Sequence, residues 1–186
     1  MTKTLFISSQ WLLPAVKAGG PAKSVNLLIE ALKKEKSSTI VLASDKDLDG
    51  TQVADKQNNN NAFLRSESIF KIIVFLIQSI RKCDALYLND FFSIKYNLLP
   101  FCIGRLMGKT IFLAPRGMLT EGALAIKPEK KKKYIAILKS IAYFKNVNLH
   151  FTDETEKADY LKLNLPLAKQ SFVLPNFAEE VAFVEQ

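Results

Sequence analysis

Short apolar runs alternate with helical patterns along almost the whole sequence, and this alternation constrains the fold more than any other feature. Runs with the length and composition of buried strands occupy residues 3–9, 39–43, 85–88, 110–114, 147–152 and 171–174. Helices are expected between them at residues 21–36, 66–81, 94–107, 128–145 and 153–163. Such alternation is typical of β-α-β units, in which a helix returns the chain to begin the next parallel strand. The sequence therefore predicts an α/β domain with a doubly wound, mostly parallel sheet.

The composition is that of one folded domain. The chain has 186 residues, 48% of them hydrophobic, which is enough to fill a core at this size. The longest apolar stretch, Ile69 to Ile80, is interrupted by Lys71 and Gln78 and is shorter than the roughly 20 residues that cross a bilayer, so we expect a buried helix. Because the N-terminus has no long apolar signal core, we expect a cytoplasmic protein. Cys83 and Cys102 form no C-x-x-C pair, and reduced, buried thiols are expected.

One internal segment lacks the apolar residues that folding needs. Residues 45–61 are polar and include an Asp-Gly pair and four consecutive asparagines, Asn58 to Asn61. Such a segment buries too little area to offset the entropy lost on ordering. We therefore expect residues 45–61 to be a mobile loop.

The segments that follow the strands are the places to look for a ligand, because an open parallel sheet binds ligands beyond the carboxyl ends of its strands. The first such segment holds Gly19 and Gly20 directly before a helix. Two glycines let backbone N–H groups approach an anion, and the helix N-terminus adds positive charge, so a phosphate site is one interpretation and a simple turn is the other. The chain has neither a G-x-G-x-x-G nor a G-x-x-x-x-G-K-[ST] motif, so dinucleotide and P-loop sites lack support.

Several single residues have two interpretations each. Asn89 and Asp90 either bind a ligand hydroxyl or cap the turn that follows. Trp11 either stacks on a sugar ring or packs within its own loop, and Glu156 fits the first turn of a helix through the helix dipole. His150 is the only histidine, and we expect a structural role because no second His or Cys completes a metal set or a catalytic triad. No metal and no cofactor are expected.

Four segments, taken together, resemble the N-terminal domain of family-4 GT-B glycosyltransferases. They occur in the family's order and cover nearly the whole chain: Leu5 to Val25 with its glycine pair, Ala114-Pro115-Arg116-Gly117-Met118-Leu119, His150 to Glu156, and Val173-Leu174-Pro175-Asn176. The second segment is similar to a Pro-Arg-Gly-Met-Leu branch that is associated with polysaccharide assembly. Phe177 departs from the family's usual glycine. Arg116 stands where many members have a histidine, and a guanidinium cannot act as a base.

The resemblance implies a fold, an activity and a set of site residues. Residues 1–177 would form the Rossmann-like N-terminal domain, and residues 178–186 a linker toward a C-terminal domain with the Glu-x7-Glu carboxylates and most donor contacts. The complete protein would move a sugar, with retention, from a nucleotide-sugar donor to a glycan or lipid-linked acceptor. Gly19 and Gly20 would face the donor phosphates. Acceptor-side residues would be Trp11, Asn89, Asp90, Arg116, Gly117, Thr152 and Glu156.

Two alternatives stay open at this stage. One alternative function is a stand-alone, non-catalytic module of the same fold that binds a glycan or a partner. The alternative for Arg116 is a salt bridge to a neighbouring carboxylate such as Glu121 rather than contact with a ligand. As an isolated domain, the chain is expected to show no appreciable sugar transfer.

The excess of basic residues also bears on the choice of partners. Lys plus Arg exceed Asp plus Glu by 8, and Lys130 to Lys133 form an unbroken run near the start of an expected helix. A solvated helical turn is one interpretation of the run, and peripheral contact with anionic lipid at the inner membrane face is the other. Nucleic acid is not an expected partner, because the aromatic residues are not interleaved with the basic ones.

Overall fold

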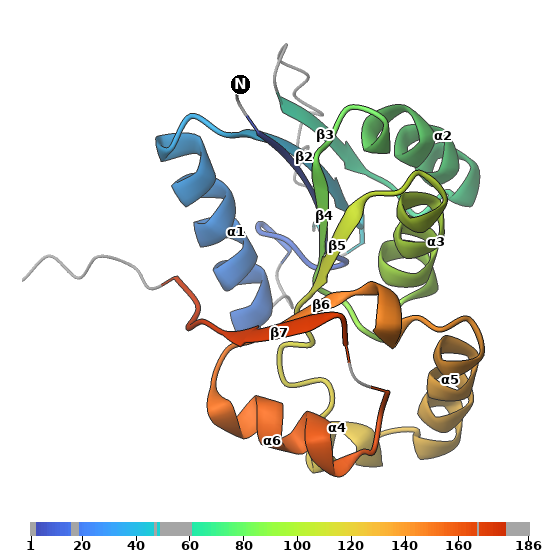
Figure 1. Cartoon of the computed structure of the whole chain (residues 1–186). Coiled ribbons are helices and arrows are strands. Elements are labelled where there is room, and N and C mark those ends of the chain that lie inside the picture. Colours follow the sequence, from blue (N-terminus) through green and yellow to red (C-terminus); the bar gives the residue numbers. More distant parts are fainter. Residues whose placement is uncertain (1–2, 16–18, 47, 49–60, 167, 178–186) are drawn as a thin grey trace, which may run out of the picture.

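The fold is a seven-stranded parallel sheet with helices on both faces (Figure 1). The computed structural model describes residues 3–15, 19–46, 48, 61–166 and 168–177. Its strands are β1 Thr4–Ser8, β2 Ser38–Ala43, β3 Asn61–Arg65, β4 Ala85–Leu88, β5 Thr110–Leu113, β6 Asn148–Phe151 and β7 Gln170–Val173. Every neighbouring pair is parallel, in the order β3-β2-β1-β4-β5-β6-β7. The predicted α/β class with a doubly wound sheet is confirmed.

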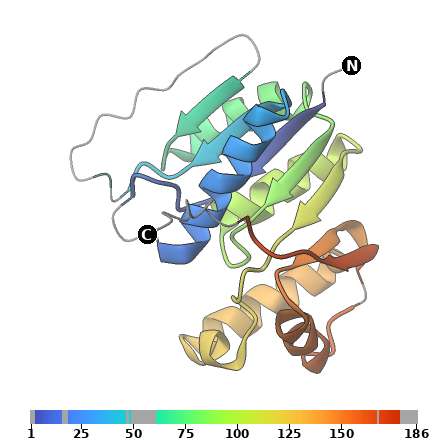
Figure 2. The same ribbon diagram turned by 90° about the vertical axis from the view of Figure 1, so that its left-hand side faces the viewer.

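The helices are divided unequally between the two faces of the sheet. They are α1 Gly19–Lys34, α2 Ile69–Ile80, the π-helix η1 Ile94–Leu98, α3 Leu99–Leu106, α4 Glu121–Ala125, α5 Pro128–Ser140, the 3-10 helix η2 Phe144–Asn146 and α6 Glu154–Lys162. Figure 1 shows α1 on one side of the sheet and α2 and α3 on the other. Figure 2 shows α1 crossing in front of the strands. Among the described residues, α1 is thus the helix that covers its face.

Each face of the sheet has its own core. On the α1 side, Val25 and Ile29 of the helix pack on Ile7, Val41 and Tyr87 of the strands. The larger core lies on the other side and includes fully buried side chains of α2, α3 and the segment around η2, among them Ile72, Leu76, Phe101, Tyr143 and Phe144. Burial on both faces explains why the strand sequences are nearly continuous apolar runs, as expected of a parallel sheet.

The structure corrects the number of strands. Strand β3 was not predicted, because Asn61 ends an asparagine run and only Ala62, Phe63 and Leu64 follow as an apolar signal. The strand forms at the edge of the sheet by pairing with β2, from Thr39 opposite Asn61 onward. Asn61 therefore belongs to a strand rather than to the predicted loop. Of the rest of that loop, residues 47 and 49–60 lie outside the described residues, and so does the predicted linker 178–186.

Helix boundaries and assignments differ from the sequence expectation in several places. The expected helix 66–81 begins at Ile69 and ends at Ile80, and the expected helix 94–107 is the π-helix η1 followed by α3. Helix α1 begins at Gly19 rather than at Pro21. The expected helix 128–145 ends at Ser140, because Ala142 takes a left-handed φ of 53° and turns Tyr143 and Phe144 into the core. The short α4 lies in a segment that was expected to be a loop.

No helix in the described part of the chain is both long enough and apolar enough to cross a bilayer.

Candidate functional site

The strand order places a topological switch point at the centre of the sheet. Strand β1 lies between β2 and β4. The connection after β1 leads to β2 on one side, whereas the connection after β4 leads away from β1 on the other side. A crevice forms at the carboxyl edge where such neighbouring connections diverge, and this is where ligands of open α/β sheets bind. The segment after β1 carries Ser9 and Gln10, and the segment after β4 carries Asn89 and Asp90. Two predicted site residues thus lie at the switch point itself.

Arg116 is fixed at this edge by three side-chain hydrogen bonds. Its Nε donates to Oδ1 of Asn89 at 2.9 Å, its Nη2 to the hydroxyl of Tyr87 at 3.3 Å, and its Nη1 to Oδ1 of Asn176. A guanidinium has five N–H groups, so these bonds leave donors for a ligand. The predicted alternative partner Glu121 is not bonded to Arg116 among the described contacts; its place is taken by Asn89, Tyr87 and Asn176.

The backbone around Arg116 is unusual. Arg116 and Gly117 have φ values of 49° and 73°, in the left-handed region that few residues other than glycine adopt. A non-glycine residue held there costs about 1–3 kcal/mol and persists only where its surroundings determine it. Here the surroundings are the three guanidinium bonds and a buried carboxylate, Glu156, which accepts from the N–H of Gly117 at 2.6 Å.

Glu156 ties the Arg116 turn to the segment after β6. Its side chain is buried, with Oε1 bonded to Gly117 and Oε2 accepting from the backbone N–H and the hydroxyl of Thr152 at 2.7 and 2.9 Å. Asp153 caps α6 by accepting from the N–H of Glu156 at 2.8 Å. Thr152, Gly117 and Glu156 were predicted as acceptor-side residues, and the structure brings all three together beside Arg116.

Two further residues of this site were not predicted. The hydroxyl of Tyr87 lies 2.5 Å from Nδ1 of His150, and Nε2 of His150 lies 2.8 Å from the carbonyl oxygen of Leu174. Since a carbonyl can only accept, Nε2 carries the proton and Nδ1 accepts from the tyrosine. Burial lowers the pKa of His150, while burial raises the pKa of Tyr87. Both groups are therefore uncharged at neutral pH, which is consistent with the structural role expected of His150.

Asp90 is a buried carboxyl group at this edge. It is 5% exposed, and its Oδ2 accepts from the backbone N–H of Gln10. Burial raises its pKa to about 6, and hydrogen bonds from Gln10 and Ser9 and the charge of Arg116 only partly oppose that rise. Carboxyl groups with pKa values near neutrality occur often at functional sites. Asp90 also joins the loops after β1 and β4 across the switch point.

The glycine pair begins α1, and Trp11 lies in the segment that follows β1. Gly19 has a φ of 55°, and a side chain added at Gly20 would have no described atom within 4 Å. Trp11 packs against Ala15 and against Ala22 of α1. Whether this tryptophan also stacks on a sugar stays a prediction.

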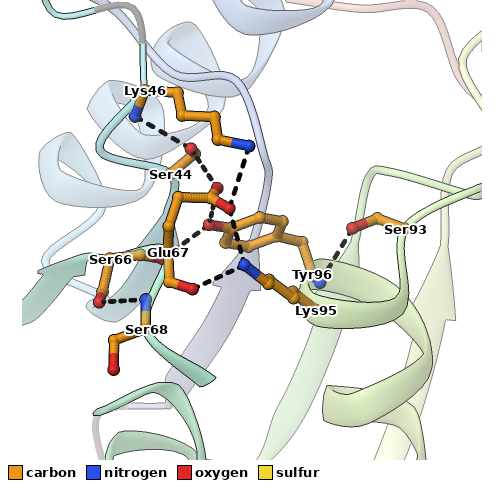
Figure 3. Close-up of polar contacts among 8 residues, drawn as sticks. All are labelled: Ser44, Lys46, Ser66, Glu67, Ser68, Ser93, Lys95 and Tyr96. Atoms are coloured by element: carbon orange, nitrogen blue, oxygen red, sulfur yellow. Dashed lines mark hydrogen bonds and ion pairs between the residues drawn. The ribbon is translucent and has the colours of Figure 1, made fainter. Parts of the chain in front are cut away.

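A second polar cluster surrounds Glu67, just after β3 (Figure 3). Its Oε1 accepts from the hydroxyls of Ser44 and Tyr96 at 2.6 and 2.7 Å, and its Oε2 pairs with Lys95 at 2.8 Å and Lys46 at 3.3 Å. Burial alone would raise the pKa of Glu67, but the bonds from Lys95, Ser44, Tyr96 and Lys46 outweigh burial and lower it to about 2. Through these bonds the ionised carboxylate connects the ends of β2 and β3 to η1, in the segment that follows β4.

An apolar groove of about 670 Å³ opens beside Arg116. Leu28 of α1 forms one wall, and the floor consists of side chains on the same face of neighbouring strands, where Tyr87 is paired with Phe112 and His150 with Phe172. The segment after β7 forms the rim with Leu174, Pro175, Asn176 and Phe177. The groove exists because α1 reaches only part of this sheet face.

The described residues contain no group of three or more His, Cys, Asp or Glu side chains arranged to hold a metal ion. The polar groups at this edge are instead hydrogen-bond donors and acceptors of neutral or singly charged side chains. Their chemistry suits hydroxyl-rich or anionic ligands.

Comparison with known proteins identifies the fold of this chain but does not identify a family. No protein-family description matches the sequence, and no curated protein matches it either. Among solved structures, the chain is similar to a sucrose-phosphate synthase chain from Thermosynechococcus elongatus, with a TM-score of 0.59 and 12% identity over 96% of this chain and 91% of that one. It is also similar to the UDP-GlcNAc 2-epimerase of Methanocaldococcus jannaschii, with a TM-score of 0.54 and 13% identity over 95% of this chain.

A third similar structure is that of S. aureus MnaA with UDP, with a TM-score of 0.55 and 14% identity over 95% of this chain. The chain spans 46% of the M. jannaschii epimerase and 45% of MnaA, which is just under half of each. The fold is therefore a Rossmann-like α/β domain of the kind that forms one half of GT-B proteins.

Proposed function

We propose that this chain is the acceptor-side, N-terminal half of a GT-B glycosyltransferase that moves a sugar from a nucleotide-sugar donor to a glycan or lipid-linked acceptor, with retention of configuration. The observation that carries the proposal is the Asn89–Arg116 pair at the switch point, which holds a guanidinium with unused N–H groups at the carboxyl edge of a GT-B-like sheet. Planar N–H donors of this kind suit sugar hydroxyls, carboxylates and phosphates.

Each residue of the edge has a distinct role in this proposal. Arg116, Asn89, Asp90 and Trp11 contact the acceptor, and Gly19 and Gly20 at the start of α1 face the donor phosphates. Gly117, Thr152 and Glu156 act by positioning, because the Glu156 carboxylate is already filled by Gly117 and Thr152. Arg116 has no role as a base, since a guanidinium stays protonated.

Donor binding in this proposal is shared with a second domain. The similar epimerase chains are about twice as long as this chain, as its coverage of 45–46% of their lengths shows. MnaA with UDP is a protein of the same fold that binds a uridine nucleotide. A cleft between two domains would bring the donor to the acceptor held at the switch point.

The test measures transfer of labelled sugar from UDP- and GDP-sugars to glycans and to membrane lipid extracts. It compares the longest natural polypeptide that contains this sequence with the 186-residue chain alone. We expect transfer by the longer polypeptide and none by the chain alone. Arg116→Lys should lower kcat/KM for the acceptor about tenfold and Arg116→Ala more, because the planar two-pronged donor is lost.

The same assay separates the alternative function. Acceptor binding without transfer by any form of the protein would identify a non-catalytic glycan-binding module. Unchanged acceptor affinity in Arg116→Ala, together with a lower melting temperature, would remove Arg116 from the site and leave it a structural residue.

A further inference from the structure

Helix α2 is apolar on both of its sides. Nine of its twelve residues are apolar, and one side packs into the core through three fully buried residues, Ile72, Leu76 and Ile80. The opposite side is turned to solvent, with Phe70 76% exposed and Val74 and Ile77 each 38% exposed. Residues four and three apart follow one another along a helix face, so Phe70, Val74 and Ile77 form one continuous stripe.

This stripe departs from what an outer helix of a globular protein normally shows. Such a helix carries polar residues on its solvent side, and a helix that is apolar all round is normally buried all round. The outer side of α2 therefore has the composition of a surface that is covered in the working protein.

A further exposed apolar side chain lies at the end of the neighbouring helix. Leu106 at the end of α3 is 87% exposed. The two helix ends are joined, because Nζ of Lys109 donates to the carbonyl oxygens of Arg81 and Cys83 at 3.3 and 2.6 Å. In turn, Arg105 donates to the carbonyl oxygen of Ile141 at 2.6 Å and connects α3 to the end of α5. Figure 1 shows α2, α3 and α5 following one another along the same side of the molecule.

The segment from the start of α2 into η2 is strongly basic. Residues 69–145 contain 14 Lys or Arg and 4 Asp or Glu, an excess of 10, whereas the whole chain has an excess of 8. Within α2, α3 and α5 the one acidic residue is Glu129, which pairs with Lys132 at 3.2 Å. Exposed basic residues flank the apolar stripe, namely Lys71, Arg81, Lys82 and Arg105.

The lysine run of α5 divides into two kinds of residue. Nζ of Lys131 lies 4.8 Å from the centre of the Phe92 ring and donates to the carbonyl oxygen of Ala123, so this lysine holds α5 against the domain. Lys130 and Lys133 are exposed, and their side chains pair with none of the residues that the structure describes. Ile137, one turn beyond Lys133, is 51% exposed.

We propose that this basic–apolar face, formed by Phe70, Val74, Ile77 and Leu106 together with Lys130 and Lys133, docks the protein on an anionic lipid bilayer. Apolar side chains ringed by Lys and Arg match the interface of a bilayer with negatively charged headgroups, where the apolar groups enter the acyl boundary and the cations meet the phosphates. A second copy of the chain fits less well. A symmetric dimer through this face would bring the same basic residues of both copies against each other. The proposal does not depend on the sugar-transfer function.

The experiment is cosedimentation of the purified chain with phosphatidylcholine vesicles and with vesicles containing phosphatidylglycerol, at low and at high salt. Because each basic residue near such a surface adds roughly fivefold to binding, Lys130→Gln with Lys133→Gln should weaken binding on the order of 25-fold. Phe70→Ser with Ile77→Ser should weaken it about tenfold or more while the far-ultraviolet circular dichroism stays unchanged, since both side chains are solvent-exposed.

Two matched controls come from the same chain. Leu161→Ser removes an apolar side chain that is 55% exposed on α6, outside the basic–apolar face, and should leave vesicle binding unchanged. Lys131→Gln removes one lysine of the same run and should lower the melting temperature with at most about a twofold loss of vesicle binding, because its ammonium already contacts Phe92 and Ala123.

Three results would overturn the proposal. One is the absence of binding to phosphatidylglycerol vesicles at low salt. Another is an equal loss of binding in Leu161→Ser and in the Phe70 and Ile77 double variant. The third is a dimer in sedimentation velocity that Phe70→Ser with Ile77→Ser dissolves, since a second copy of the chain would then be what covers the face.

Discussion

Asp90→Asn is expected to stabilise the protein at neutral pH and to remove one component of its pH dependence. Asp90 is 5% exposed, and burial raises its pKa from 3.8 to about 6. The folded state therefore holds the Asp90 proton more tightly than the unfolded state does. This contribution to stability is complete below pH 3.8 and is lost as the pH rises through about 6.

The magnitude follows from the size of the shift. A change of about 2 pKa units corresponds to about 3 kcal/mol of differential stability, at about 1.4 kcal/mol per unit. An asparagine at position 90 keeps an oxygen that can accept from the N–H of Gln10 but carries no charge to desolvate. The free energy of unfolding of wild type minus that of Asp90→Asn should thus fall by up to about 3 kcal/mol between pH 4 and pH 7.5.

The assay is urea unfolding, followed by circular dichroism at fixed ionic strength across that pH range. Asp90→Ala is the matched control: it also lacks the ionisable group and should lose the same pH dependence, but it leaves the N–H of Gln10 without its acceptor and should be less stable than Asp90→Asn by about 1–3 kcal/mol at every pH. Wild type and Asp90→Asn curves that stay parallel from pH 4 to pH 7.5 would refute the argument that burial governs this carboxyl group.

Three further predictions test other parts of the structure. Ala142→Gly should raise the free energy of unfolding by about 1 kcal/mol in urea titrations, because Ala142 has a φ of 53° that glycine adopts without strain; a loss of stability would contradict this. Gly104→Ala should lower the free energy of unfolding by about 1–3 kcal/mol, since the added Cβ would lie 2.7 Å from Cδ2 of the buried Leu86. Gly122→Ala, whose added Cβ has nothing within 4 Å, should change the melting temperature by no more than a few degrees. Equal effects of the two substitutions would refute the packing argument. Glu67→Gln should lower the free energy of unfolding by about 1–2 kcal/mol at pH 7. Because the folded pKa of Glu67 is about 2 against a usual 4.5, this difference from wild type should shrink as the pH falls from 4.5 toward 2. A difference that is constant with pH would argue against an ionised Glu67.

The fold was predictable from sequence because its signal is local and repeated. Each buried strand is an apolar run, and each intervening helix has its own periodicity, so errors at one element leave the others intact. Strand β3 was not predicted because its apolar signal is only three residues long, Ala62 to Leu64, and because its place at the edge depends on pairing with β2. The end of α5 was not predicted because the left-handed Ala142 is stabilised by the burial of Tyr143 and Phe144, and helix propensity does not include such contacts.

The site was predictable only in part, for a different reason. Asn89, Arg116 and Thr152 could be named because each lies at the end of a predicted strand or just after it, and strand ends share an edge of a parallel sheet. Their partners could not be named. Tyr87 and His150 are 63 residues apart, and their 2.5 Å contact requires the lateral order β4-β5-β6, which the sequence does not state. The sequence offered only a weak indication of this pair. Tyr87 and His150 are aromatic residues with a polar group, and each stands one residue before the end of its strand.

The hydrogen bonds of His150 and Arg116 place the segment after β7 within the site. Leu174 accepts from His150, Asn176 accepts from Arg116, and both residues also border the apolar groove. Resemblance to a Pro-Asn element had suggested only a connection to another domain for these residues. In the structure Asn176 is the third hydrogen-bond partner of the guanidinium that Asn89 and Tyr87 also hold. Movement of this segment would therefore change the number of guanidinium N–H groups open to a ligand, which links the geometry of the chain beyond β7 directly to the chemistry of the carboxyl edge.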